Sequence, residues 1–349
     1  MAFYDGFFNG LGLREWCDAS NTRGPMSMAE LLQKSKSAAT SGHSLVDAPF
    51  PSLDALHDAC NAVPRTRDLT SGIENGFLSI RVMLKAILDP LTQPLSWLLD
   101  FSLRAVEVIP WWVLVLALLL IVYLSSRSWP ILALVAAILL LLGFLDHLHY
   151  ALQTMVVVFS CTFICILLGI PIGIVMSKSN GMERITIPVL DMLQTLPPFV
   201  YLIPLIFLFS VTESKLYGIA IIFYAIVPVV RLTNLGIRLV DGSVGEAADA
   251  FGMDRWQKLS KVEIPLALPS IMAGVNQTIM MALSMVVIAS LVSAPGLGVL
   301  VLRGINNLEL GTGLVAGFGI VLLAIAFDRV SKASMARVSG TLQSRGAGH

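Results

Sequence analysis

The chain contains little charge for its size. Of its 349 residues, 13% are charged and 56% are hydrophobic, and 23 Lys and Arg balance 23 Asp and Glu. Average soluble domains carry about a quarter charged residues. Half that content, with apolar residues in long blocks, predicts an integral membrane protein surrounded by lipid. The zero net charge gives no case for a nucleic-acid partner, and no polybasic stretch suggests lipid headgroup binding.

Cysteine is also scarce, with four residues in the chain. These are too few for a disulfide scaffold, and none forms a CxxC pair. Cys161 and Cys165 lie in an apolar run, where we expect small packing residues. Cys17 and Cys60 lie in the polar N-terminal region and could pair if that region is exported, although two cysteines alone specify little.

Other absences narrow the function. The first residues lack a basic stretch followed by an apolar core, so we expect internal helices rather than a cleavable signal peptide to direct insertion. The chain has no GxxxxGK[ST], the loop motif that binds the phosphates of ATP, so we expect any ATP and Mg²⁺ to be bound by another subunit. No nucleophile–base arrangement or pair of catalytic carboxylates is evident, so no catalytic residue is predicted. His147 and His149 are spaced as weak metal ligands, and an interfacial role is expected instead of a metal site.

The chain divides by composition. Residues 1–75 are polar and interrupted by Pro and Gly, which predicts short helices and loops. Residues 76–109 are helical in pattern, with a predicted break at Pro90 and Pro94. The part from 95 to 109 predicts an amphipathic helix on the membrane surface, the alternative being a buried helix of a small soluble domain. Its polar face carries Asp100, Arg104 and Glu107, and its apolar face carries Leu95, Leu99, Leu103 and Val106.

Seven apolar segments follow. The first two are short for a hydrocarbon core that needs about 20 helical residues, and Trp111, Trp112 and Trp129 flank them as interfacial anchors. Either the two segments form a tight hairpin around Arg127, or one of them does not fully cross the membrane. We predict spans at 110–125, 129–145, 151–176, 187–210, 216–238, 269–293 and 312–330.

Basic residues give the orientation. With seven spans, the loops on one side contain most of the Lys and Arg, and positive loops remain in the cytoplasm. The C-terminus is therefore expected inside, and an odd number of spans places the N-terminal region outside. The basic side receives Arg127, Lys178, Arg184, Arg255, Lys258, Lys261, Lys332, Arg337 and Arg345, and the loops of the other side receive Lys215 and Arg303.

One predicted cytoplasmic loop, 240–269, is longer and more structured than the others. Ser243 and Glu246 are spaced as a capping box that starts a short helix, and Gly252 can end it in the left-handed conformation. A second short helix is expected from Asp254. The first helix has a narrow apolar stripe with small residues, which suits insertion into a groove of a partner. The stripe consists of Val244, Ala247, Ala248 and Phe251.

The spacing in this loop resembles the EAA loop of binding-protein-dependent ABC importer permeases. Glu246-Ala247-Ala248 is followed after three residues by Gly252, and after nine more by Val262-x-Ile264-Pro265, with Val and Ile where Ile and Leu are usual. The resemblance implies a coupling helix that docks on a cytoplasmic ABC ATPase. The residues implied in coupling are Glu246, Ala247, Ala248, Phe251, Gly252, Asp254 and Arg255.

Stretches 190–204, 273–290 and 296–305 resemble the permeases for glycine betaine, proline betaine and choline. The resemblance implies a type I permease core of five transmembrane helices at 150–331, two added spans at 110–145 and a cytoplasmic tail at 332–349. It also implies a periplasmic binding protein, a second copy of the chain, and a location in the bacterial inner membrane. Glycine betaine, choline, proline betaine, carnitine and trimethylamine N-oxide all remain open as solutes.

Polar residues within the predicted spans suggest a translocation path. Amides are costly in lipid unless they face the bundle interior or a wet cavity, although they can also simply hold helices together. Aromatic rings bind quaternary ammonium groups, although aromatics at helical spacing are more often core residues. The candidate path residues are Gln194, Thr195, Phe199, Tyr201, Asn276, Gln277 and Ser284.

Three other interpretations stay open. A permease of the same type for taurine or a phosphonate would share the coupling loop. A secondary carrier or channel would need no ATPase and leaves the 240–269 loop without a role. A membrane-embedded enzyme should show clustered His, Asp or Ser at one depth, and the sequence has no such cluster.

Overall fold

The computed structural model describes residues 8, 11–13, 17, 52–60 and 62–346, and every regular element within them is a helix. The chain separates into two compact units, residues 1–83 and 84–349. The predicted all-α class is confirmed for the described residues.

The first unit contains a disulfide between Cys17 and Cys60, the pairing that the sequence left open. Cys60 ends helix α4 (Leu53–Ala59), which Ser52 caps by accepting a hydrogen bond from the amide of Ala55 at 3.2 Å. Most of the predicted polar region 1–75 lies outside the described residues. The disulfide closes a loop of the chain with a sequence separation of 43 residues.

Helix α5 (Thr66–Val108) continues through Pro90 and Pro94, so the predicted break there is wrong. Each proline removes one backbone hydrogen bond. Tertiary contacts in the second unit hold the helix on both sides of the prolines. On one side the carboxylate of Asp89 accepts a hydrogen bond from Lys215 at 2.7 Å, and on the other Leu99 is fully buried.

The predicted apolar face of α5 is buried against protein. Leu95, Leu99 and Val106 are buried, and Leu103 packs against the core. The hydroxyl of Ser214, at the start of α11 (Ser214–Arg238), donates a hydrogen bond to Asp100. The stripe that suggested contact with a membrane surface therefore contributes to the core of the second unit.

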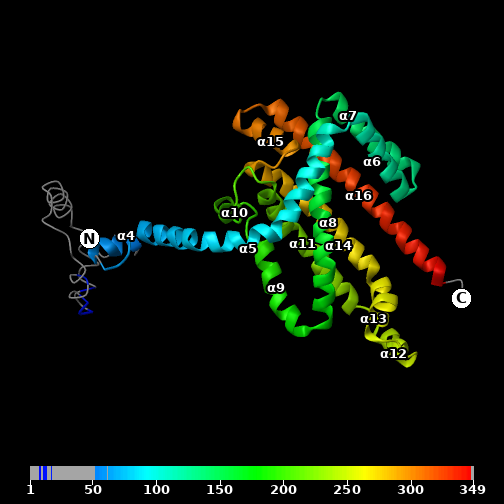
Figure 1. The fold of residues 1–349 in the computed structure, drawn as a ribbon, viewed down its shortest axis with the longest axis horizontal. Coiled ribbons are helices and arrows are strands. Elements are labelled where there is room, and N and C mark those ends of the chain that lie inside the picture. The colour runs from blue at the N-terminus through cyan, green and yellow to red at the C-terminus, as the bar shows by residue number, and fades with distance from the viewer. Residues whose placement is uncertain (1–7, 9–10, 14–16, 18–51, 61, 347–349) are drawn as a thin grey trace, which may run out of the picture. The chain divides into compact units, whose positions relative to one another are not determined.

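The core of the second unit lies between α8 (Leu148–Lys178), α11 and α14 (Ile264–Ala289), which pack side by side (Figure 1). Cys161 and Cys165 are buried, and their thiols face the carbonyls of Gly218 and Ile222 on α11. Their predicted role as packing residues is confirmed.

Two glycines allow α8 to approach α11 closely. A Cβ at Gly169 would lie 2.4 Å from a side-chain carbon of Val229, and one at Gly173 would lie 2.8 Å from the carbonyl oxygen of Val230. Because lipid offers no hydrophobic drive for helix association, small residues that let backbones approach are a main source of packing in membranes. The pair at i and i+4 on α8 serves that role.

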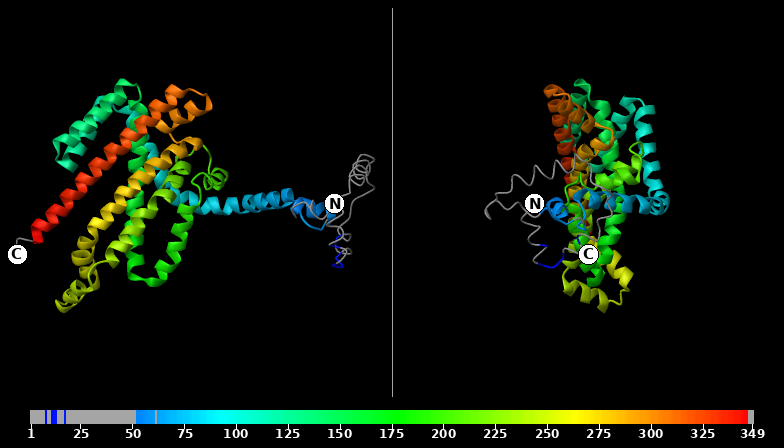
Figure 2. Two further views of the ribbon diagram at one scale, coloured as in Figure 1. Left: turned by 180° about the vertical axis from the view of Figure 1, so that it is seen from behind. Right: turned by 90° about the vertical axis from the view of Figure 1, so that its left-hand side faces the viewer.

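By length and composition, four helical stretches among the described residues could cross a membrane. Helices α5 and α6 (Trp111–Ser126) count as a fifth candidate only as a bent pair, with 119° between them. Helix α7 (Trp129–Phe144) has 16 residues, as does α6, and Arg127 in the left-handed conformation joins the two as the predicted hairpin (Figure 2). The four stretches are Leu148–Lys178, Ser214–Arg238, Arg255–Val292 and Leu310–Arg337.

The predicted continuous span at 187–210 is wrong. The structure has α9 (Asn180–Thr195) and a separate α10 (Leu202–Leu208), with non-helical residues at 196–201. The residue before a proline is driven out of the helical region. Leu196, which precedes Pro197, accordingly has φ −67° and ψ 130°.

Helices α15 (Leu297–Asn306) and α16 (Leu310–Gly346) pack against each other and complete the second unit. The two short helices α12 (Gly242–Ala250) and α13 (Arg255–Lys258) lie at the same end of this unit as the turn between α8 and α9 (Figures 1 and 2). Helix α15 and the turn between α7 and α8 lie at the opposite end. The predicted coupling loop therefore occupies one end of the helix bundle.

Candidate functional site

The N-cap of helix α12 is Asp241, two residues before the predicted cap. The Asp241 carboxylate accepts a hydrogen bond from the backbone amide of Ser243 at 2.9 Å. This backbone hydrogen bond lowers the pKa of Asp241, because it favours the charged carboxylate. Ser243 lies inside the helix, so the predicted capping box of Ser243 with Glu246 is wrong.

Gly252 ends α12 as predicted, with φ +71°. Its amide donates to the carbonyl of Asp249 at 2.9 Å, and the amide of Met253 donates to the carbonyl of Ala248 at 3.1 Å. These two bonds form a Schellman motif, which requires a residue with positive φ after the helix. No atom lies within 4 Å of a Cβ built on Gly252, so the conformation, and not the space, selects glycine there.

Helix α13 follows with Asp254 at its N-cap, which confirms the predicted start. The side chain of Gln257 accepts a hydrogen bond from the Asp254 amide at 3.3 Å. Lys258 on α13 donates to the carboxylate of Asp249 on α12 at 2.8 Å, which ties the two short helices together. A π-helical turn, Leu259–Glu263, then leads directly into α14.

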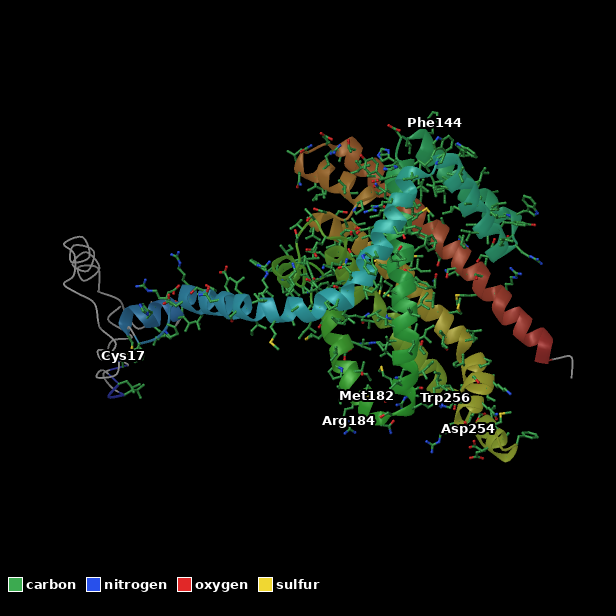
Figure 3. All side chains as sticks on the ribbon, viewed as in Figure 1. Cys17, Phe144, Met182, Arg184, Asp254 and Trp256 are labelled. Atoms are coloured by element: carbon green, nitrogen blue, oxygen red, sulfur yellow. A yellow bond between two sulfur atoms is a disulfide. The ribbon has the colours of Figure 1, made fainter. Side chains whose placement is uncertain are left out.

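Two large aromatic side chains are exposed in this segment, one directly after α12 and one in α13. Phe251 is 84% exposed and Trp256 is 76% exposed, while Ala248 is buried. Figure 3 shows Asp254 and Trp256 at the end of the second unit. Exposed aromatic rings of this kind are typical anchors of a protein interface. Of the other predicted coupling residues, Glu246, Ala247 and Arg255 are also exposed.

Ion pairs connect the turn between α8 and α9 to neighbouring elements. Glu263, 8% exposed at the end of the π-helical turn, pairs with Lys178 at the C-terminus of α8. Arg238 at the end of α11 pairs with Glu183 of α9 at 3.0 Å and donates to the carbonyl of Met176 at 2.9 Å. The turn between α8 and α9 is therefore held by charged groups from two other elements.

Part of the predicted path is brought together by one contact between the end of α9 and α14. The Gln194 amide nitrogen lies 3.9 Å from the sulfur of Met281. Gln277 and Ser284 share the face of Met281, because they lie four and three residues from it on the same helix. Gln277, Ser284 and Thr195 are exposed in the isolated chain.

The remaining predicted path residues lie elsewhere. Asn276 donates to the carboxylate of Asp328 on α16 at 3.4 Å, on a different side of α14 from Gln194. Tyr201 is 8% exposed and packs in the main core. Its hydroxyl has no hydrogen-bond partner among the described residues. Phe199, in the break between α9 and α10, is 56% exposed.

Several residues of this region were not selected from the sequence. Lys178, Arg238, Lys258 and Glu263 gain their roles from contacts between elements, whereas Trp256 is singled out by its exposure. Glu263 is the middle residue of the Val262-x-Ile264-Pro265 motif, so the motif could have been used to select it. Lys178 and Arg238 lie at the ends of predicted spans. Basic residues at such positions indicate the orientation of the chain in the membrane, and they do not by themselves predict an ion pair.

Together, a bundle of apolar helices and a capped two-helix segment at one end define a polytopic all-α membrane protein. Residues 166–340 match the family described as the binding-protein-dependent transport system inner membrane component, and the chain belongs to this family. It is a transport permease subunit and not an enzyme.

Similar proteins include permeases whose names specify small quaternary amines. The chain is 40% identical over 247 residues to the glycine betaine/carnitine transport permease protein GbuB of Listeria monocytogenes, covering 70% of this chain and 87% of that protein. It is 46% identical over 195 residues to the glycine betaine/proline betaine permease protein ProW of Escherichia coli, covering 56% of this chain and 55% of that protein. The trimethylamine N-oxide permease protein TmoV of Ruegeria pomeroyi is 33% identical, with 83% of this chain and 43% of that protein covered.

Proposed function

We infer that the chain forms the membrane path of an ATP-driven importer for a small quaternary or methylated amine. The observation that supports this most is its 40% identity to a glycine betaine/carnitine permease, over 87% of that protein's length. Glycine betaine, carnitine, proline betaine, choline and trimethylamine N-oxide share a methylated, positively charged nitrogen. Four of these solutes appear in the names of the similar proteins: glycine betaine, proline betaine, carnitine and trimethylamine N-oxide.

ATP hydrolysis is assigned to a separate ABC ATPase that binds α12 and α13. Support comes from the exposed Phe251 and Trp256 and from the hydrogen bonds that cap the helix end and the helix start between them. A partner groove that receives Phe251 would bury an aromatic side chain, which is the usual basis of an interface hot spot. Closure of the ATPase would then move α12, α13 and the attached α14.

The path itself is proposed to lie between two copies of the chain. The face that carries Gln194, Thr195, Gln277 and Ser284 is partly exposed in one copy, together with the apolar side chains of Met192 and Leu196. A second copy would cover the apolar groups and leave the polar ones along a central passage. A weak, transient site suits an importer whose binding protein supplies the specificity.

The proposed orientation places α12, α13 and the C-terminus in the cytoplasm of a bacterium and residues 1–75 outside the inner membrane. Basic residues of the turn between α8 and α9 and of α13 lie at one end of the bundle, as cytoplasmic loops require. The Cys17–Cys60 disulfide supports an outside location for the N-terminal unit, because disulfides persist in oxidising compartments.

The experiment is reconstitution of the chain with its ATPase and its binding protein in liposomes. ATP hydrolysis is measured against a panel of methylated amines, with taurine and a phosphonate as comparison solutes. Stimulation by a methylated amine that depends on the binding protein is the expected result. Stimulation by taurine or the phosphonate alone would contradict the solute class, and transport by the chain without any ATPase would contradict the importer class.

A further inference from the structure

The ion pair between Lys178 and Glu263 connects the two-helix segment to a helix that lies 85 residues earlier in the chain. Glu263 is the last residue of the π-helical turn that leads from α13 to α14. Lys178 is the last residue of α8, directly before the turn into α9. The pair therefore joins the candidate coupling segment to the α8–α9 turn without passing through the length of α14.

The two partners have different surroundings. The Glu263 side chain is 11% exposed, whereas the Lys178 side chain is 47% exposed. A carboxylate with so little access to water depends on its cation, because an unpaired buried charge is strongly unfavourable. Movement of Glu263 is therefore expected to move Lys178 with it.

The π-helical turn adds a structural reason for motion at this point. π-Helical turns inside α-helices are rare and occur frequently at functional sites. Leu259–Glu263 has this conformation, between α13 and α14. Such a turn can rearrange with a small change in hydrogen bonding, so Glu263 lies where movement of α12 and α13 reaches α14.

On the far side of Lys178, the α8–α9 turn leads to the candidate path. Arg238 of α11 holds the same turn through Asn180 at 3.0 Å and through Glu183 at 3.0 Å. Helix α9 then runs for 16 residues, about 24 Å at 1.5 Å per residue, to Gln194 and Thr195 near its C-terminus. A tilt of the turn would be carried along this helix to the face of α14 at Met281.

We propose that Lys178 and Glu263 are positioning residues that transmit movement of the coupling segment to α9, and through α9 to the translocation path. This inference rests on the proposed function. It assigns to the ion pair a role in linking ATP hydrolysis to uptake, with the α8–α9 turn as the element that receives the movement. Arg238 anchors the turn on α11, so that the turn pivots instead of shifting as a whole.

The test uses the complete complex of chain, ATPase and binding protein in liposomes. The variants are Lys178→Glu, Glu263→Lys and the double variant that exchanges both charges. Three quantities are measured: uptake of labelled glycine betaine, ATP hydrolysed per solute taken up, and the amount of ATPase that copurifies. The double variant restores opposite charges at the same two positions. It therefore recovers function if the two residues act as a pair, and it does not recover function if each charge is needed for a separate reason.

A matched control reverses a charge in an ion pair that joins no two elements. Lys332 pairs with Asp328 at 2.8 Å within α16, four residues apart. Lys332→Glu changes the net charge as Lys178→Glu does, but breaks a contact inside a single helix. Uptake per ATP by Lys332→Glu is expected to remain near the wild-type value.

The expected result is a loss of about tenfold in uptake per ATP for each single variant, with ATPase copurification retained. The double variant is expected to recover to within about twofold of wild type. Wild-type coupling in both single variants would overturn the proposal, and so would a double variant no better than the single ones.

Phe251→Asp distinguishes this outcome from failure of the proposed function. If Phe251→Asp abolishes ATPase binding while Lys178→Glu and Glu263→Lys couple normally, the docking role of α12 stands and the ion-pair proposal falls. If Phe251→Asp also binds the ATPase and couples normally, the proposed coupling segment is contradicted, and the ion-pair proposal falls with it.

Discussion

The candidate coupling segment and the candidate path differ in how far apart their residues lie along the chain. The coupling residues lie within 240–269 and are shaped by local hydrogen bonds, such as those of Asp241 and Gly252. The path residues come from α9, from the break that follows it and from α14, and the contact between Gln194 and Met281 spans 87 residues. Structure formed by neighbouring residues can be predicted from their spacing alone, whereas contacts made by helix packing cannot.

Burial differs in the same way. The aromatic side chains of the coupling segment project outward, with Phe251 84% exposed, whereas Tyr201 of the candidate path is 8% exposed. Substitutions in the coupling segment should therefore act on partner binding with little effect on folding. Substitutions among the packed helices should act first on stability.

The largest effect is expected from Phe251→Asp. If Phe251 is buried in the proposed ATPase interface, a charge at this position should weaken binding by about thirtyfold or more. Membrane insertion and thermal stability should not change, because the side chain makes little contact within the chain. ATPase copurification and uptake provide the measurement, and Phe251→Leu, which remains apolar, is the control. Equal loss of binding in both variants would show that the aromatic position does not act through its apolar character.

Gly173→Ala tests the close packing of α8 against α11. The added Cβ would lie 2.6 Å from the Cβ of Thr233 and 2.8 Å from a backbone oxygen of α11. We expect a loss of about 1–3 kcal/mol in the stability of the purified chain, seen as a lower midpoint of thermal unfolding in detergent. Gly317→Ala on α16, where no atom lies within 4 Å, is the matched control. An unchanged midpoint in Gly173→Ala would contradict the close approach of α8 and α11.

Gly252→Val tests whether the end of α12 must adopt its left-handed conformation. Side chains cost about 1–2 kcal/mol in this conformation, so we expect the Schellman motif to be lost and uptake to fall several-fold. Insertion into the membrane should be retained. Gly242, the first residue of α12, also has no neighbour within 4 Å and has no positive φ, so Gly242→Val should transport better than Gly252→Val. Equal uptake by the two variants would argue against a need for the turn.

The smallest effect is expected from Tyr201→Phe. The Tyr201 hydroxyl is buried without a hydrogen-bond partner among the described residues, so its removal should change stability by less than about 1 kcal/mol. If the hydroxyl contacts the passing solute, the solute concentration at half-maximal uptake should rise while stability is unchanged. A large loss of stability would instead assign Tyr201 a purely structural role.

The sequence predicted those features that depend on a few neighbouring residues. Gly252 and Asp254 were placed correctly, because a helix end and a helix start each have a local signature. The first cap was misplaced, since Asp241 and Ser243 are both good N-caps and only the folded turn decides between them. The predicted all-α membrane class followed from composition, and the chain's family confirmed it.

Features set by tertiary contact were predicted less well. The break at Pro90 and Pro94 was expected from proline alone, and the contacts of Asp89 and Leu99 keep α5 continuous. The span at 187–210 was read from hydropathy, which does not report the backbone change at Leu196. Asn276 and Gln277 looked equivalent in sequence, yet Asn276 faces Asp328 and Gln277 lies on the face of Met281.

The most direct test of the account is site-specific photo-crosslinking of the assembled importer. A photoreactive residue replaces either Phe251 in the turn after α12 or Phe144 at the opposite end of the second unit (Figure 3), and both positions are at least 84% exposed. The account predicts that the probe at position 251 crosslinks to the ATPase and that the probe at position 144 does not. No crosslink from position 251, or an equal crosslink from position 144, would contradict the assignment of 240–269 as the coupling segment.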